Sequence, residues 1–154
     1  MPQHLVLEEF EISGSSVSAA VFVSPKTLRV SAALAAALLA MRPTLAEHTC
    51  KQQGFGYFGD KIVGTTLPHL VEHLAIDLLV EENRQKTEGK TEPVSDASQA
   101  SHQETPQAIA GITRWLDRDQ GKMQVKLSCT AQGADKTCRA ITRAIDVLNY
   151  LLEP

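Results

Sequence analysis

The sequence has few cysteines, little excess charge and no long apolar run, and each absence argues against a class of protein. Three cysteines among 154 residues are an odd count without close pairs, which argues against a disulfide framework. A formal net charge of −3 offers no basic face for nucleic acid. No stretch reaches the roughly 18 apolar residues that a membrane-spanning helix needs. We therefore expect neither nucleic acid nor a membrane as a partner.

Other signals are also missing. The opening segment, MPQHLVLEEF, has no charged start followed by an apolar run, as a secretory signal would. The chain contains no P-loop, dinucleotide-binding fingerprint or nucleophile elbow. With 43% hydrophobic residues, 154 residues suffice for one domain with its own core. We expect a single cytoplasmic domain over residues 1–154.

The first part of the chain predicts a hairpin followed by a helix. Apolar residues and strand formers predict strands at 5–12 and 17–23, separated by a Ser-Gly-Ser turn. Ser24 and Pro25 are typical of a helix start, because serine caps free amides and proline fits the first turn. Pro43 predicts that this Ala-rich helix ends just before it.

The second part predicts another helix, a polar insertion and a second strand pair. The helix runs from about 66 to 82, and the polar segment 83–105 is expected to be a flexible insertion. Strands are predicted at 109–116 and 123–129. A final helix carries a core stripe at helical spacing, formed by Cys138, Ile141, Ile145, Leu148 and Leu152. The order ββα-α-ββα predicts an α+β fold, one antiparallel sheet with helices on one face.

A His-x-x-Glu-His motif lies on the second predicted helix. His69 and His73 are one turn apart and therefore share a face, with Glu72 beside them. Two imidazoles at this spacing can bind one metal ion, and a neighbouring carboxylate can move a proton. The pattern is that of the inverzincins, so zinc is the expected cofactor. Mostly apolar neighbours favour a dry site rather than a solvated helix face.

A catalytic zinc site needs a third protein ligand, and three residues are candidates. His48 and Cys50 lie in the glycine-rich segment 44–64, and Cys129 lies on the inward face of the last predicted strand. The residues alone leave these three alternatives open. The site as predicted takes His69, His73 and His48 as metal ligands and Glu72 and Cys50 as catalytic residues.

Several motifs occur in the order found in a known family. The sequence resembles the N-terminal domain of cyanophycin synthetases over roughly residues 40–150. The resemblance rests on the runs Pro43-Thr44-Leu45-Ala46-Glu47-His48-Thr49-Cys50, Gly54-Phe55, Gly64-Thr65-Thr66-Leu67-Pro68-His69-Leu70-Val71-Glu72-His73-Leu74-Ala75 and Gly111-Ile112-Thr113-Arg114.

The resemblance implies a metallohydrolase-like fold, similar to pitrilysin-type peptidases and S-ribosylhomocysteine lyase. In some members the domain is a zinc-dependent hydrolase that cuts a polymer with an Asp backbone and Arg side groups. Carried over, His69 and His73 would be zinc ligands and Glu72 the general base, with His48 and Cys50 near the site. The resemblance thereby implies a peptide or polymer substrate, and an Arg-rich one if the substrate is the family's polymer.

The chain also departs from the family. We expect no ATP-grasp or ligase domain within these 154 residues. The insertion at 83–105 is unlike the family's tighter connection, and the last predicted strand lacks expected Tyr and Glu residues. The leading expectation is a zinc-dependent hydrolase of an amide or peptide bond. The alternatives are a non-catalytic peptide- or polymer-binding module and a zinc lyase of a small metabolite. An open sheet edge favours a homodimer by analogy.

Overall fold

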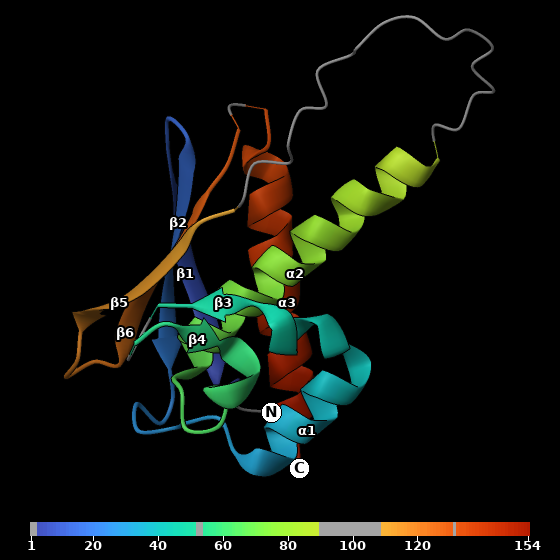
Figure 1. Cartoon of the computed structure of the whole chain (residues 1–154). Helices are drawn as coiled ribbons and strands as arrows, with labels where there is room; N and C mark the ends of the chain where they lie inside the picture. The colour runs from blue at the N-terminus through green and yellow to red at the C-terminus, as the bar shows by residue number, and fades with distance from the viewer. Residues whose placement is uncertain (1–2, 52–53, 90–108, 131) are drawn as a thin grey trace, which may run out of the picture.

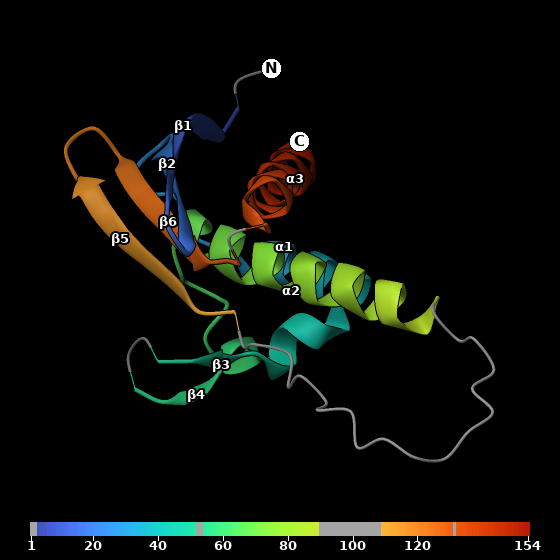
Figure 2. The same ribbon diagram turned by 90° about the horizontal axis from the view of Figure 1, so that it is seen from above.

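The computed structural model shows one four-stranded antiparallel sheet with helices on one face (Figures 1 and 2). It describes residues 3–51, 54–89, 109–130 and 132–154. The strand order is β1-β2-β6-β5, and a separate two-stranded sheet joins β3 and β4. The predicted α+β class, with its antiparallel sheet, is confirmed. The elements are β1 Leu5–Ser13, β2 Ser16–Val23, α1 Ala32–Met41, η1 Pro43–Glu47, β3 Thr49–Cys50, β4 Gly56–Tyr57, η2 Phe58–Asp60, α2 Leu67–Glu88, β5 Gly111–Asp117, β6 Lys122–Ser128 and α3 Ala134–Leu152.

The two central strands, β2 and β6, supply much of the sheet's buried face. Side chains alternate across a strand, so every second residue faces the helices. Helix α2 packs on β5 and β6, whereas α3 packs on β1 and β2 and also contacts α2. The inward residues of the central strands oppose one another in register, as Val17 with Leu127, Ala19 with Val125, and Val21 with Met123.

Helix α1 begins later than the sequence predicts. Ser31 rather than Ser24 is its N-cap, and the Ser31 hydroxyl accepts from the Leu34 amide at 3.1 Å. The reason lies in Val30, whose amide donates to Thr65 and whose carbonyl accepts from the Gly64 amide. Residues 24–27 form bends and a turn, and the two bonds of Val30 then flank a β-bridge between Arg29 and Thr66, so the helix starts only after residue 30. The predicted end before Pro43 is confirmed.

Helix α2 is longer than expected and takes in the first part of the predicted insertion. It continues to Glu88, so residues 83–88 are helical, whereas the sequence predicted a helix end near residue 82. The extra turns contain an ion pair between Glu82 and Lys86, four residues apart, and a contact from Lys136 of α3 to Asn83. The rest of the predicted insertion, from 90 to 105, lies outside the described residues. Among the helices that the structure describes, none is long and apolar enough to cross a bilayer.

Asn149 ties the C-terminal helix to the first strand. Its side-chain oxygen accepts from the amides of His4 and Leu5 at 3.1 and 2.9 Å, and its amide group donates to the Leu5 carbonyl at 2.8 Å. Leu5 is fully buried. Its backbone groups therefore depend on this side chain for their hydrogen bonds.

We expect Asn149→Ala to lower the free energy of unfolding by about 1–3 kcal/mol, because it leaves buried backbone groups unpaired. Urea denaturation measures this loss. The neighbouring Tyr150 is 74% exposed and provides the control, with a change within about 0.5 kcal/mol for Tyr150→Ala. Equal losses in the two variants would contradict the role assigned to Asn149.

Candidate metal centre

Two threonines fix the start of α2 and the orientation of its first histidine. Thr66 is the N-cap, and its hydroxyl accepts from the His69 amide at 3.3 Å. The cap places His69 in the first helical turn. Thr65, just before the cap, lies with its hydroxyl 2.6 Å from Nδ1 of the same histidine. Nδ1 of His69 is thereby engaged, and Nε2 is directed toward β3.

Cys50, His69 and His73 form a buried group of three metal-binding side chains. One ligand atom from each lies within 4.8 Å of the other two. Sγ of Cys50 is 3.6 Å from Nε2 of His69. All three residues are at most 4% exposed. The structure thus joins the predicted histidine pair to the cysteine, which the sequence places in a different segment.

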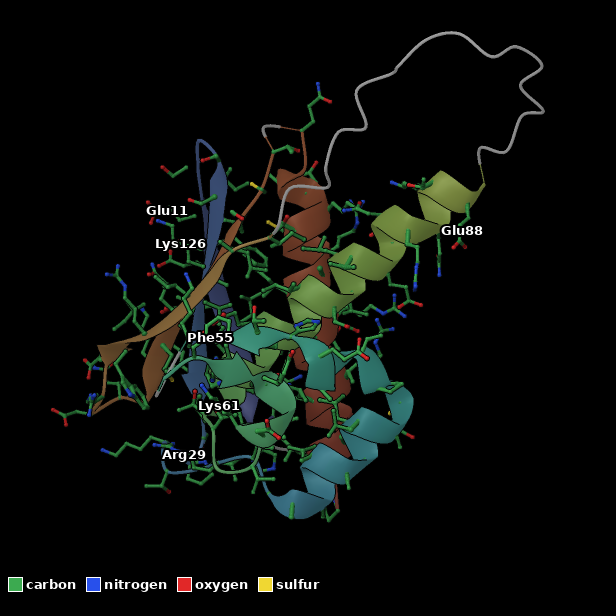
Figure 3. The ribbon with its side chains drawn as sticks, in the orientation of Figure 1. Glu11, Arg29, Phe55, Lys61, Glu88 and Lys126 are labelled. Carbon is green, nitrogen blue, oxygen red and sulfur yellow. The ribbon has the colours of Figure 1, made fainter. Side chains whose placement is uncertain are left out.

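Short local contacts hold Cys50 in place. Its backbone pairs with Gly56 across the β3–β4 sheet, and the Lys61 ammonium donates to the Cys50 carbonyl at 3.1 Å. Lys61 also donates to the carbonyl of Gly54, on the turn between these strands. Figure 3 shows Lys61 beside this small sheet, with the exposed Phe55 nearby. The β3–β4 pairing and the two hydrogen bonds of Lys61 therefore hold the cysteine close to α2.

Phe58 closes the apolar side of the site. Its ring stacks on that of His73 with centroids 3.8 Å apart, and it meets the ring of His69 edge-on at 5.4 Å. Phe58 is fully buried. An aromatic wall of this kind excludes water and fixes the planes of both imidazoles.

The two imidazoles are neutral at ordinary pH. Burial, together with the nearby Lys61 charge, lowers the pKa of His69 from 6.5 to about 4. Burial and the neighbouring His69 and His48 lower the pKa of His73 to about 3. Neutral imidazole is the form that binds metals.

The spacing of the group fits a metal ion. A tetrahedral zinc with ligand distances of about 2.3 Å to sulfur and 2.0–2.1 Å to nitrogen places the two atoms about 3.6 Å apart. The Cys50–His69 separation of 3.6 Å matches this value, and it also suits a thiol–imidazole hydrogen bond. The donor set and its burial therefore allow a metal ion to be held.

Glu72 lies one turn after His69 and points to the start of β5. The Thr113 hydroxyl donates to its Oε2, and the residue is 5% exposed. Burial raises the pKa of Glu72, although the hydrogen bond from Thr113 opposes the shift. Gly111 makes room for this carboxylate, because a Cβ there would lie 2.6 Å from Oε1.

His48 lies beside the group but has a different set of partners. Its Nδ1 is 3.3 Å from Nδ1 of His73, and its Nε2 is 3.1 Å from Oδ1 of Asp77. It is not one of the three residues whose ligand atoms cluster within 4.8 Å in the described part of the chain. Its assignment as a ligand stays a prediction. Cys129, the remaining candidate, lines a cavity with Leu79, Lys86 and Gly133 instead.

Sequence reasoning missed the residues that hold the site in place. Thr65, Phe58, Asp77 and Thr113 each contact a histidine or Glu72. Thr65 and Thr113 lie within the runs that carry the family resemblance but were given no role there, and Asp77 had a signal in its spacing. It lies four residues after His73 on the same helix, which places it on the histidine face. Thr65 is only four residues from His69, whereas the contacts of Phe58 and Thr113 depend on how distant segments meet.

Fold and site together define a small α+β domain with a buried Cys–His–His group that can hold a metal ion. A family described as the cyanophycin synthase-like N-terminal domain matches residues 24–102, just over half of the 154 residues. The chain belongs to this family. The match ends before the segment 111–114, which formed part of the resemblance. No curated protein matches the chain.

We expect Gly111→Ala to destabilise the protein by about 1–3 kcal/mol, because the new methyl group overlaps the Glu72 carboxylate. Urea denaturation checks the loss. Gly89→Ala is the matched control, since a Cβ at that position meets nothing nearer than 3.5 Å. The close approach of Glu72 to β5 would be refuted by equal stability of the two variants.

The histidine pKa values predict how the stability of the metal-free protein depends on pH. With pKa values of about 4 and 3 when folded and 6.5 as reference, His69 and His73 bind protons more readily in the unfolded chain. The contribution of the two neutral histidines to the free energy of unfolding is therefore complete above pH 6.5. It falls as the pH drops below that value, by about 1.4 kcal/mol per pH unit for each histidine.

Urea denaturation of chelator-treated protein between pH 7 and pH 5 measures this slope. His73→Gln removes one of the two groups, so its slope should be shallower by up to about 1.4 kcal/mol per pH unit. Parallel curves for the variant and the natural sequence would show that His73 does not titrate in this way.

Proposed function

We propose that the chain is a zinc-dependent hydrolase of an amide or peptide bond. One observation carries the proposal. Two neutral, buried imidazoles and a buried cysteine converge at one point, and a buried carboxylate follows one turn later on the same helix. Family membership supports the same conclusion.

The donor set favours zinc among the common metals. Thiolate and imidazole suit zinc, whereas magnesium and calcium take oxygen ligands. Cys50, His69 and His73 would be the three protein ligands, which leaves a fourth position for water or substrate. This assignment moves Cys50 from the catalytic residues of the sequence-based prediction to the ligands.

When bound, zinc polarises a carbonyl group and makes water more acidic. Glu72 would accept the proton from the attacking water and pass it to the departing amine. Its buried carboxylate has a raised pKa, which brings its proton affinity closer to that needed near neutral pH. The Thr113 hydroxyl holds one carboxylate oxygen and leaves the other to take part.

The substrate class in this proposal is a peptide or a peptide-like polymer with Asp and Arg residues. Its support is the family to which the chain belongs and the resemblance of residues 43–75 to that family's motifs. A peptide-binding module and a small-molecule lyase are the competing functions, and the test below separates the hydrolase from the binding module.

We expect protein purified without chelator to contain one zinc ion per chain, and Glu72→Gln to keep the zinc but lose at least about 100-fold in hydrolysis rate. Metal analysis and release of amino groups from an Asp-backbone polymer with Arg side groups, or from a casein digest, measure the two effects. Glu11→Gln, an exposed change on the sheet, is the control and should leave both unchanged.

Three results would contradict the proposal. A chain that cannot be loaded with zinc would refute the metal site. Binding of the polymer without cleavage, unaffected by His69→Ala, would identify a binding module. Undiminished hydrolysis in Glu72→Gln would remove the general base.

A further inference from the structure

A carboxylate behind the metal centre is held by three side chains. Asp77 is 4% exposed, and its Oδ2 accepts from Nε of Arg42 at 2.7 Å. Its Oδ1 accepts from the Thr44 hydroxyl at 2.7 Å and lies 3.1 Å from Nε2 of His48. Burial opposes ionisation, but the hydrogen bonds from His48, Thr44 and Arg42 outweigh it and lower the pKa of Asp77 to about 2.

An ionised carboxylate only accepts hydrogen bonds, and this fixes the role of one nitrogen of His48. Its Nε2 must carry a proton to bond to Asp77. In a neutral ring, Nδ1 then has the lone pair and acts as an acceptor. This nitrogen faces Nδ1 of His73 at 3.3 Å.

The same reasoning passes from His48 to His73. Because Nδ1 of His48 accepts, Nδ1 of His73 must donate for the pair to form a hydrogen bond. The lone pair of the neutral His73 ring is then on Nε2. In His69 too, Nδ1 has a partner, the Thr65 hydroxyl, while Nε2 faces Cys50. A hydroxyl both donates and accepts, so this contact is compatible with either tautomer.

We propose that Asp77 is a positioning residue that sets the tautomers of His48 and His73 in series, so that His73 offers Nε2 to the metal. His48 is then an intermediate between Asp77 and the ligand rather than a ligand itself. Carboxylates placed behind metal-binding histidines in this way fix ring orientation and raise ligand basicity. The inference rests on the metal site of the proposed function.

The competing arrangement has His48 and His73 both binding the ion through Nδ1. Two nitrogens on a tetrahedral zinc are about 3.3–3.4 Å apart, so the observed 3.3 Å alone does not separate the two arrangements. What favours the series is the three-residue cluster. Within the described residues, it contains Cys50, His69 and His73 but not His48.

The first experiment reads the tautomers directly in the metal-free protein. Long-range proton–nitrogen NMR spectra of the histidine rings should show His48 protonated on Nε2 and His73 on Nδ1. In Asp77→Asn the amide can donate as well as accept, so this state is no longer enforced and the spectra of both rings should change. A proton on Nδ1 of His48 in the natural sequence would overturn the inference, and that measurement requires no variant.

The second experiment measures zinc affinity by competition with a chromophoric chelator. Asp77→Asn should weaken binding by about 10–100-fold. In a His48→Gln background the same change should have little further effect, because Asp77 acts through His48. Glu81→Gln, which removes the outer partner of Arg42, is the control and should bind zinc normally.

The outcomes separate this inference from the proposed function. If the natural sequence binds no zinc, the proposed function fails while the tautomer spectra still decide the inference. If zinc binds but the losses in the double variant simply add, Asp77 does not act through His48. If cobalt-loaded His48→Gln shows a changed ligand-field spectrum of the kind expected on loss of a nitrogen ligand, His48 is a ligand and the series is wrong.

Discussion

The burial of the first two turns of α2 is the constraint on which the rest of the structure depends. Every residue from 67 to 75 is buried, so this part of the helix has no solvent face. A helix buried all round is normally apolar, yet this one carries His69, Glu72 and His73. Buried polar groups need partners, and among the described residues no buried side-chain nitrogen or oxygen lacks one. The neighbouring segments are arranged around that requirement.

Much of the frame could be predicted because it depends on periodicity. Alternation at β2 and β6, the apolar stripe of α3 and the proline after α1 are local signals, and the structure confirms them. The start of α1 could not be predicted, because the backbone bonds of Val30 to Gly64 and Thr65 are made across the chain. Likewise, the part of α2 beyond its predicted end contacts Lys136, which comes from another helix. The helix propensity of a local segment gives no information about such contacts.

The candidate site shows the same division. The spacing of His69 and His73 places them together on any helix, and the sequence also marked Cys50 as a neighbour. It could not choose among His48, Cys50 and Cys129, because the choice depends on where the β3–β4 hairpin and the end of β6 lie relative to α2. Thr113 is 41 residues from Glu72, so no spacing rule relates them. The sequence thus identified the chemistry of the site, and folding determines its geometry.

The partners of the site come from four different parts of the chain, and this couples metal binding to folding. Thr65 precedes α2, Phe58 belongs to η2, Thr113 to β5, and Cys50 to β3. Only Thr65 is close to the histidines in sequence, four residues before His69. A metal ion would therefore find the complete donor set only in the folded protein, and its binding free energy would add to stability. The metal-free protein is correspondingly less stable, because it keeps two imidazoles and a carboxylate buried.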